Sequence, residues 1–280
     1  MSVLLALFAS LAYGVGDFIG GLASRRGSAF AVALWASIGG GIAMCLAAVV
    51  VGGRADPVDL GWGVLAGIGN GMGGTFLYRG LAAGRMGVVA PLSSLTGALL
   101  PIVAGLALGE RPSALSWCGI LLALPAVGLI SREPAAPGNG GGGRLGAGVV
   151  DGLLAGLGFG LLFIATGQIA PSAGLWPLVA LQMASIVVIP FLASLLRQAW
   201  WPTRRAEAIG LIGGILAAAA VLGFMLAAQR GLLSIVAVLT ALYPAATIAL
   251  AAIILNERLR PIQGLGLILA GGAVVLIALG

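Results

Sequence analysis

Asp17 is the residue whose type and position most clearly suggest chemistry. It lies inside an apolar stretch, in the run Tyr13-Gly14-Val15-Gly16-Asp17-Phe18, about two helical turns before Arg25 and Arg26. A carboxylate at the depth of lipid hydrocarbon costs about 2.5–3.5 kcal/mol on insertion scales. Such a group could let a proton and a substrate compete for one site. The structural alternative is that Asp17 reaches interfacial water and pairs with an arginine.

Three further carboxylates lie near predicted helix ends. Asp151 stands about one turn into an apolar segment, where the positive end of the helix dipole favours a carboxylate, so we expect a capping or interfacial role. Glu110 and Glu257 each close an apolar segment and are followed by Arg111 and Arg258. We expect these two Glu–Arg pairs to be structural groups at the membrane boundary, as ion pairs or hinge anchors.

Polar uncharged side chains within the apolar segments are candidates for lining a cavity, although each could equally hydrogen-bond across a helix–helix contact. The wider set is Asn70, Tyr78, Ser93, Ser94, Thr96, Thr166, Gln168, Gln182, Ser185, Gln229, Thr240, Tyr243 and Thr247. Beside Asp17, the candidate coupling or substrate-binding residues are Thr96, Gln168, Thr240, Tyr243, Tyr78, Asn70 and Trp35. The spacing of Thr240, Tyr243 and Thr247 predicts a polar stripe on one helix face.

Composition identifies lipid as the solvent of this chain. Of its 280 residues 60% are apolar and only 8% are charged, with a mean hydropathy of +1.16. A soluble domain carries about a quarter charged residues. The fourteen basic residues are all arginines, set singly or in pairs between apolar runs, which is typical of membrane-boundary anchors. We therefore expect a lipid-embedded protein with no nucleic-acid partner.

Missing residue types exclude several classes of chemistry. The chain has no histidine and no lysine. Without lysine it has no Walker A loop, and without histidine it has no His-based triad and no His–zinc site. Cys45 and Cys118 both lie in apolar runs, where a free thiol behaves as a small hydrophobe. We expect no metal, no cofactor and no disulfide.

The apolar runs predict ten membrane-spanning helices, because each approaches the ~20 residues that cross the hydrocarbon core. The predicted segments are 3–23, 29–51, 60–79, 87–108, 113–131, 146–168, 174–196, 206–228, 232–255 and 261–279. A Gly/Pro-rich stretch at 132–145 reads as a flexible linker. It divides the chain into a first half, 1–131, and a second half, 146–280, each with five helices.

The two halves are predicted to be inverted repeats around a central cavity. Superposing Glu110 on Glu257 brings the order of helices and loops in the two halves into register. A unit of five helices crosses the membrane an odd number of times, so its second copy must enter from the opposite side. Loops after the odd-numbered segments hold eleven of the fourteen arginines. By the positive-inside rule that side is cytoplasmic, with both termini outside.

The chain resembles the drug/metabolite transporter superfamily, and specifically its EamA-like members. The residues that carry this resemblance are Tyr13 to Phe18 with Ser24-Arg25-Arg26, then Gly109-Glu110-Arg111, Gly119 and Gly128, then Leu239 to Pro244, Glu257-Arg258-Leu259, Gly264, Gly266 and Gly271. The first half departs from the pattern where Gly97 replaces the proline matched by Pro244, with Pro101 one turn later. The resemblance implies a non-enzymatic membrane carrier with a cavity between its halves.

Two functions are compatible with these features. The first is secondary active transport, in the export direction, of a small metabolite, amino acid or drug by alternating access. Such a carrier is expected in the cell (plasma or inner) membrane, as a monomer or homodimer, with protons as a candidate second partner. The alternative is an intramembrane aspartyl protease, because Gly14-Val15-Gly16-Asp17 resembles the Gly-x-Gly-Asp signature of such enzymes. That chemistry requires Asp151 to meet Asp17, since two carboxyls must share a proton.

Overall fold

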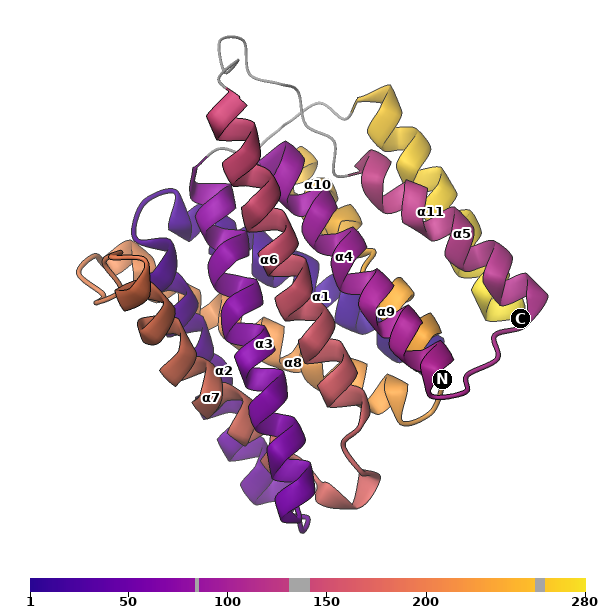
Figure 1. The fold of residues 1–280 in the computed structure, drawn as a ribbon, viewed down its shortest axis with the longest axis horizontal. Helices are drawn as coiled ribbons and strands as arrows, with labels where there is room; N and C mark the ends of the chain where they lie inside the picture. The colour runs from indigo at the N-terminus through magenta and orange to yellow at the C-terminus, as the bar shows by residue number, and fades with distance from the viewer. Residues whose placement is uncertain (84–85, 131–141, 255–259) are drawn as a thin grey trace.

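The computed structural model describes residues 1–83, 86–130, 142–254 and 260–280, which form an all-α bundle (Figure 1). The first half contains α1 (Ser2–Ser24), α2 (Ala29–Val51), α3 (Pro57–Ala82), α4 (Met86–Ala107) and α5 (Ala114–Ile130). The second half contains α6 (Gly142–Gly167), α7 (Trp176–Leu195), α8 (Gly210–Ala228), α9 (Leu233–Thr240), α10 (Tyr243–Ile254) and α11 (Pro261–Leu279). Short 3-10 helices, η1 (Pro171–Ala173) and η2 (Arg205–Ile209), precede α7 and α8.

Eight helical stretches in the described residues are long and apolar enough to cross a membrane. They are α1, α2, α4, α6, α7, α11, the stretch from η2 through α8, and the stretch from α9 through α10. The remaining two long helices are α5, which has only 17 residues, and α3, whose 26 residues include many glycines and two charged side chains. The described residues therefore form an all-α membrane protein of ten long helical stretches, counting α9 with α10 as one, and this agrees with the ten apolar runs.

The ninth predicted segment is broken between α9 and α10. Pro244 has no N–H to donate to the carbonyl of Thr240, so the regular helical hydrogen bond is lost at this point. The backbone tightens instead, because Leu242 N donates to Leu239 O at 3.3 Å and Ala245 N donates to Leu242 O at 2.9 Å. The break separates Thr240 from Tyr243, which the sequence placed on one continuous helix.

Helix packing links the two halves closely. α3 packs against α6 and α7, while α8 packs against α1 and α2. α4 packs against α6, α1 packs against α10, and α5 pairs with α11 at one edge of the bundle (Figure 1). Both chain termini lie toward the same face of the bundle (Figure 1). The interior between the halves is thus bordered by helices from both of them.

Glycines with four-residue spacing on α3 allow its close contact with α7. On α3, a methyl group at Gly63 or Gly67 would collide with the backbone carbonyl of Pro177 or of Leu181 on α7. Without side chains in the interface, helix backbones can approach much more closely than usual. The structure identifies α7 as the helix that packs against this glycine face of α3.

The start of α3 is fixed by its own sequence. The side chain of Asp56 accepts hydrogen bonds from Val58 N at 2.9 Å and Asp59 N at 3.0 Å. Pro57 occupies the first helical position, where its missing N–H costs nothing. These signals begin α3 three residues earlier than the apolar run alone suggested.

Candidate functional site

A cavity lies between α1, α2 and α3 of the first half and α6, α7 and α8 of the second. The cavity has a volume of about 40 Å³, which is room for a few water molecules. Its lining residues are Tyr13, Asp17, Ala33, Ala36, Ser37, Asn70, Gly74, Tyr78, Phe159, Gln182, Ile189, Gly214, Ala217 and Val221. The cavity combines one carboxyl group with several neutral polar groups and an apolar wall.

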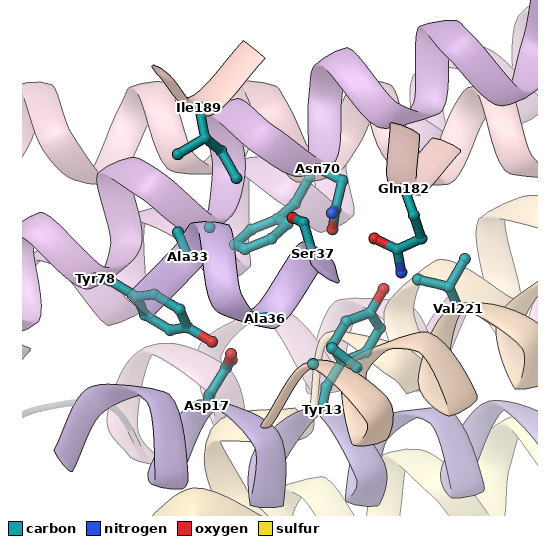
Figure 2. Close-up of a pocket in the computed structure, with 14 residues that line it drawn as sticks. Tyr13, Asp17, Ala33, Ala36, Ser37, Asn70, Tyr78, Gln182, Ile189 and Val221 are labelled. Atoms are coloured by element: carbon teal, nitrogen blue, oxygen red, sulfur yellow. The ribbon is translucent and has the colours of Figure 1, made fainter. Parts of the chain in front are cut away.

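Asp17 of α1 and Tyr78 of α3 point toward one another at one end of the cavity (Figure 2). Gly20, almost one turn after Asp17, has no side chain, and the ring and hydroxyl of Tyr78 occupy the space a methyl group would take. Tyr78 is buried, whereas Asp17 is only partly covered, with its carboxyl toward the cavity. The absence of a side chain at Gly20 is thus what lets Tyr78 approach Asp17.

Tyr13 and Gln182 form the other polar end of the cavity, where the hydroxyl of Tyr13 points toward the amide of Gln182 (Figure 2). Both side chains are more than nine-tenths buried. The Tyr13 hydroxyl and Gln182 Oε1 have no hydrogen-bond partner within the protein. Buried polar atoms are normally hydrogen-bonded, so both groups are suited to bind a water or a ligand in the cavity.

Asn70 is held by contacts behind the cavity. Its Nδ2 donates to Ser185 Oγ at 3.0 Å, and Ser185 Oγ donates in turn to the backbone oxygen of Gly67 at 2.9 Å. This chain of hydrogen bonds joins α3 to α7 and fixes the Asn70 amide group at the cavity wall. The fixed amide can offer its carbonyl oxygen to a ligand.

Asp151 differs from its expected position at a helix start. α6 begins at Gly142, so Asp151 lies in its third turn, and its side chain is fully buried. Arg79, near the end of α3, forms an ion pair with it, and Arg79 Nε donates to Asp151 Oδ1 at 2.9 Å. A capping role is therefore wrong, because the helix begins four residues, about one turn, before the apolar run.

Comparison with known proteins agrees with this architecture. The EamA-like transporter family matches residues 1–132 and 146–279. The chain belongs to the EamA-like transporter family. It is also similar to a solved structure titled "Crystal structure of protein", with a TM-score of 0.75 and 16% sequence identity, over 99% of this chain and 96% of that one. Comparison with curated proteins gives no match.

Membership of the EamA-like transporter family makes this chain a non-enzymatic membrane transporter of a small molecule. The protease alternative is therefore wrong. The geometry agrees, because Asp151 is ion-paired with Arg79 and is not among the residues that line the cavity with Asp17. A protease would need the two carboxyl groups to share one proton.

Glu110 is a helix cap in this EamA-like protein. It follows α4, and its carboxylate accepts hydrogen bonds from the backbone N–H groups of Leu233 and Ser234, the latter at 3.0 Å. Those groups open α9, whose first N–H groups have no partner within the helix. Glu110 thus joins the two halves through a cap, while Arg111 is exposed beside it. Glu257 and Arg258 lie outside the described residues.

The predicted polar stripe contacts neighbouring helices. The Tyr243 hydroxyl lies 3.4 Å from Ser93 Oγ of α4, and Thr247 Oγ1 donates to the backbone oxygen of Gly14 in α1 at 3.0 Å. Thr240 is fully buried at the break between α9 and α10. None of the three stripe residues is among those that line the cavity. The stripe contributes to helix packing around α1.

The remaining sequence candidates lie at separate places. Thr96 of α4 packs against Gly156 of α6, and Trp35 of α2 packs against Gly210 of α8. Gln168 directly follows the end of α6, where its backbone N–H donates to Ala165 O at 3.1 Å. The cavity therefore brings together Asp17, Asn70 and Tyr78 from the predicted set, and not these three residues.

Tyr13, Ser37 and Phe159 line the cavity but were not among the sequence-selected site residues. Tyr13 is one turn before Asp17, so the helical period could have placed both on one face. Ser37 and Phe159 carry no such signal, because small polar and aromatic residues are common in membrane helices. Gln182 was only one of many polar residues in the apolar segments.

Proposed function

We propose that this protein is a secondary active transporter, working as an exporter of a small metabolite, amino acid or drug by alternating access. Asp17 is the carboxyl group that binds substrate or the coupling proton. The two five-helix halves rock around the cavity in the cell membrane, and the carrier works as a monomer or a homodimer.

The observation that carries this proposal is the composition of the cavity between the halves. Among the described residues that line it, Asp17 alone carries a formal charge. Tyr13 and Gln182 add buried polar atoms without protein partners. Ionisable groups inside a membrane bundle are costly and mark substrate or proton pathways. A carrier uses such a group by letting proton and substrate occupy it in turn.

Matching helix contacts support the inverted repeat. On α8, methyl groups at Gly210 and Gly214 would collide with the backbone carbonyls of Val32 and Ala36 on α2. This repeats the contact of α3 with α7, in which glycines with the same spacing meet two carbonyls four residues apart. The family match also falls in two stretches, 1–132 and 146–279. Repeats of this kind allow a binding site near the membrane midplane to open to either side.

The sequence candidates divide into two groups under this proposal. Asp17, Asn70 and Tyr78 touch the substrate or the proton, because they line the cavity. Tyr243 and Thr96 make contacts between packed helices, and Thr240 is buried at the break between α9 and α10. Trp35 and Gln168 act at a distance, through helix packing and the end of α6.

Flux in proteoliposomes tests the proposal. The purified protein is reconstituted, and uptake of a panel of labelled amino acids, metabolites and drugs is measured with and without an imposed proton gradient. We expect at least one compound to accumulate only when the gradient is present. Equal flux with and without the gradient for every compound transported would contradict proton-coupled transport.

A further inference from the structure

We infer that the cavity selects an organic cation, namely a protonated amine with a short apolar substituent. The inference rests on the proposed function and adds the chemical class of the substrate. It follows from the balance of charge, hydrogen-bonding groups and apolar surface in the lining.

The charge of the lining disfavours an anion. Asp17 is the one formally charged residue among the described lining residues, and no arginine joins it there. Arg79, which directly follows the lining residue Tyr78, is engaged by Asp151. An anionic substrate would lie beside a carboxyl group in a low-dielectric site with no cation to neutralise it. A cation meets an opposite charge in the same place.

The neutral polar groups also suit a donor-rich ligand. Gln182 Oε1 is a buried acceptor without a protein partner. Asn70 uses its amide nitrogen toward Ser185, which leaves its carbonyl oxygen as an acceptor at the cavity wall. An ammonium group is a donor with no acceptor, so its chemistry suits the Asp17 carboxylate at one end of the cavity and the acceptor oxygens of Asn70 and Gln182 elsewhere in the lining. A carboxylate or phosphate ligand could satisfy none of these acceptors.

Aromatic and aliphatic groups complete the site. Tyr13, Tyr78 and Phe159 bring three aromatic rings to the lining, and ring faces attract cations. Gly14 of α1 and Gly156 of α6 each pack against a helix of the opposite half, and Asp17 and Phe159 follow them by three residues. The lining thus receives a carboxyl group from α1 of the first half and an apolar ring from α6 of the second. This asymmetry fits a ligand with one ammonium end and one apolar end.

Binding of three matched probes tests the inference. The purified protein in detergent is titrated with n-propylammonium, n-propanol and propionate, which share a three-carbon chain and differ in charge, and binding is followed by saturation-transfer NMR. We expect n-propylammonium to bind at least tenfold more tightly than the other two. Asp17→Asn should weaken n-propylammonium binding at least tenfold, and Gln182→Leu should weaken it severalfold.

The matched control is Asp59→Asn. Asp59 is a buried carboxylate on α3 that accepts a hydrogen bond from Ala170 N at 2.9 Å and does not line the cavity. This variant should bind n-propylammonium as the unmodified protein does. Because asparagine keeps the acceptor oxygen, the variant should also fold.

Several results would overturn the cationic substrate. One is that propionate or n-propanol binds as tightly as n-propylammonium. Another is that n-propylammonium shows no binding at a 100-fold molar excess over the protein. A third is that the Asp17→Asn and Asp59→Asn variants bind n-propylammonium equally well. Proton-driven flux restricted to neutral or anionic compounds would also reject the cation while leaving the proposed transport function intact. If no compound shows gradient-driven flux and n-propylammonium still binds selectively, the transport proposal alone is rejected.

Discussion

Arg79 and Asp151 form an ion pair that joins the end of α3 to the third turn of α6, and so joins one half of the transporter to the other. Asp151 is fully buried, and the guanidinium of Arg79 also lies 4.6 Å from the centre of the Phe76 ring. Arg79 directly follows Tyr78, whose side chain faces Asp17 in the cavity. The ion pair therefore fixes the part of α3 that borders the candidate binding site.

Removing one partner of this pair should destabilise the protein strongly. We expect Asp151→Leu to lower stability by about 2–4 kcal/mol, less than for a fully buried pair, because Arg79 is 29% exposed. The double variant Arg79→Met/Asp151→Leu should recover part of that loss, since no charge is then left without its partner. Thermal unfolding in detergent measures both effects. Strictly additive losses in the double variant would contradict the pairing.

Replacing Gly63 should disturb the contact between α3 and α7. An added methyl group would collide with the Pro177 carbonyl, and we expect Gly63→Ala to cost about 1–3 kcal/mol. Gly61 is the matched control, because a methyl group there meets no other atom, and alanine favours the helix by up to about 1 kcal/mol. Unfolding temperatures of the two variants should shift in opposite directions. Equal shifts would show that α3 and α7 are not in backbone contact at Gly63.

Glu110 should stabilise the start of α9. Glu110→Ala removes the acceptor for the backbone N–H groups of Leu233 and Ser234, and a lost cap costs about 0.5–2 kcal/mol. Hydrogen exchange at these two amides should speed up in the variant. Arg111→Ala, at the exposed neighbouring position, should leave both exchange rates unchanged. Slow exchange retained in Glu110→Ala would rule out the cap.

Asp17 should be required for coupling and not for folding. Asp17→Asn keeps the size of the side chain but removes the ionisable group, so we expect proton-driven flux to fall at least tenfold while the elution profile and unfolding temperature stay close to those of the unmodified protein. Asp17→Glu keeps the carboxyl group and should retain part of the coupling. Flux measured in proteoliposomes decides the matter, and undiminished coupled flux in Asp17→Asn would remove Asp17 from the mechanism.

Much of the architecture could be predicted because the signals are local. Apolar runs long enough to cross a bilayer lie between arginines, and most helix ends fall within three residues of the predicted ones. One exception is α8, which starts at Gly210, four residues after its predicted start, because η2 precedes it. The other is α6, which starts at Gly142, four residues before its apolar run. A glycine-rich lead-in gives no apolar signal, so the sequence could not locate Asp151 within its helix.

The sequence by itself determined that lipid is the solvent, that the chain forms ten long helical stretches and that Asp17 is an unusual residue, since each depends only on a short stretch of chain. Tertiary structure alone decided which side chains surround Asp17 and which partner Asp151 takes. Those relationships depend on which helices cross, and the crossings are set where glycines such as Gly63 and Gly214 admit a neighbouring backbone. Residues far apart in the sequence meet only there, so no local pattern could pair Tyr13 with Gln182 across the cavity.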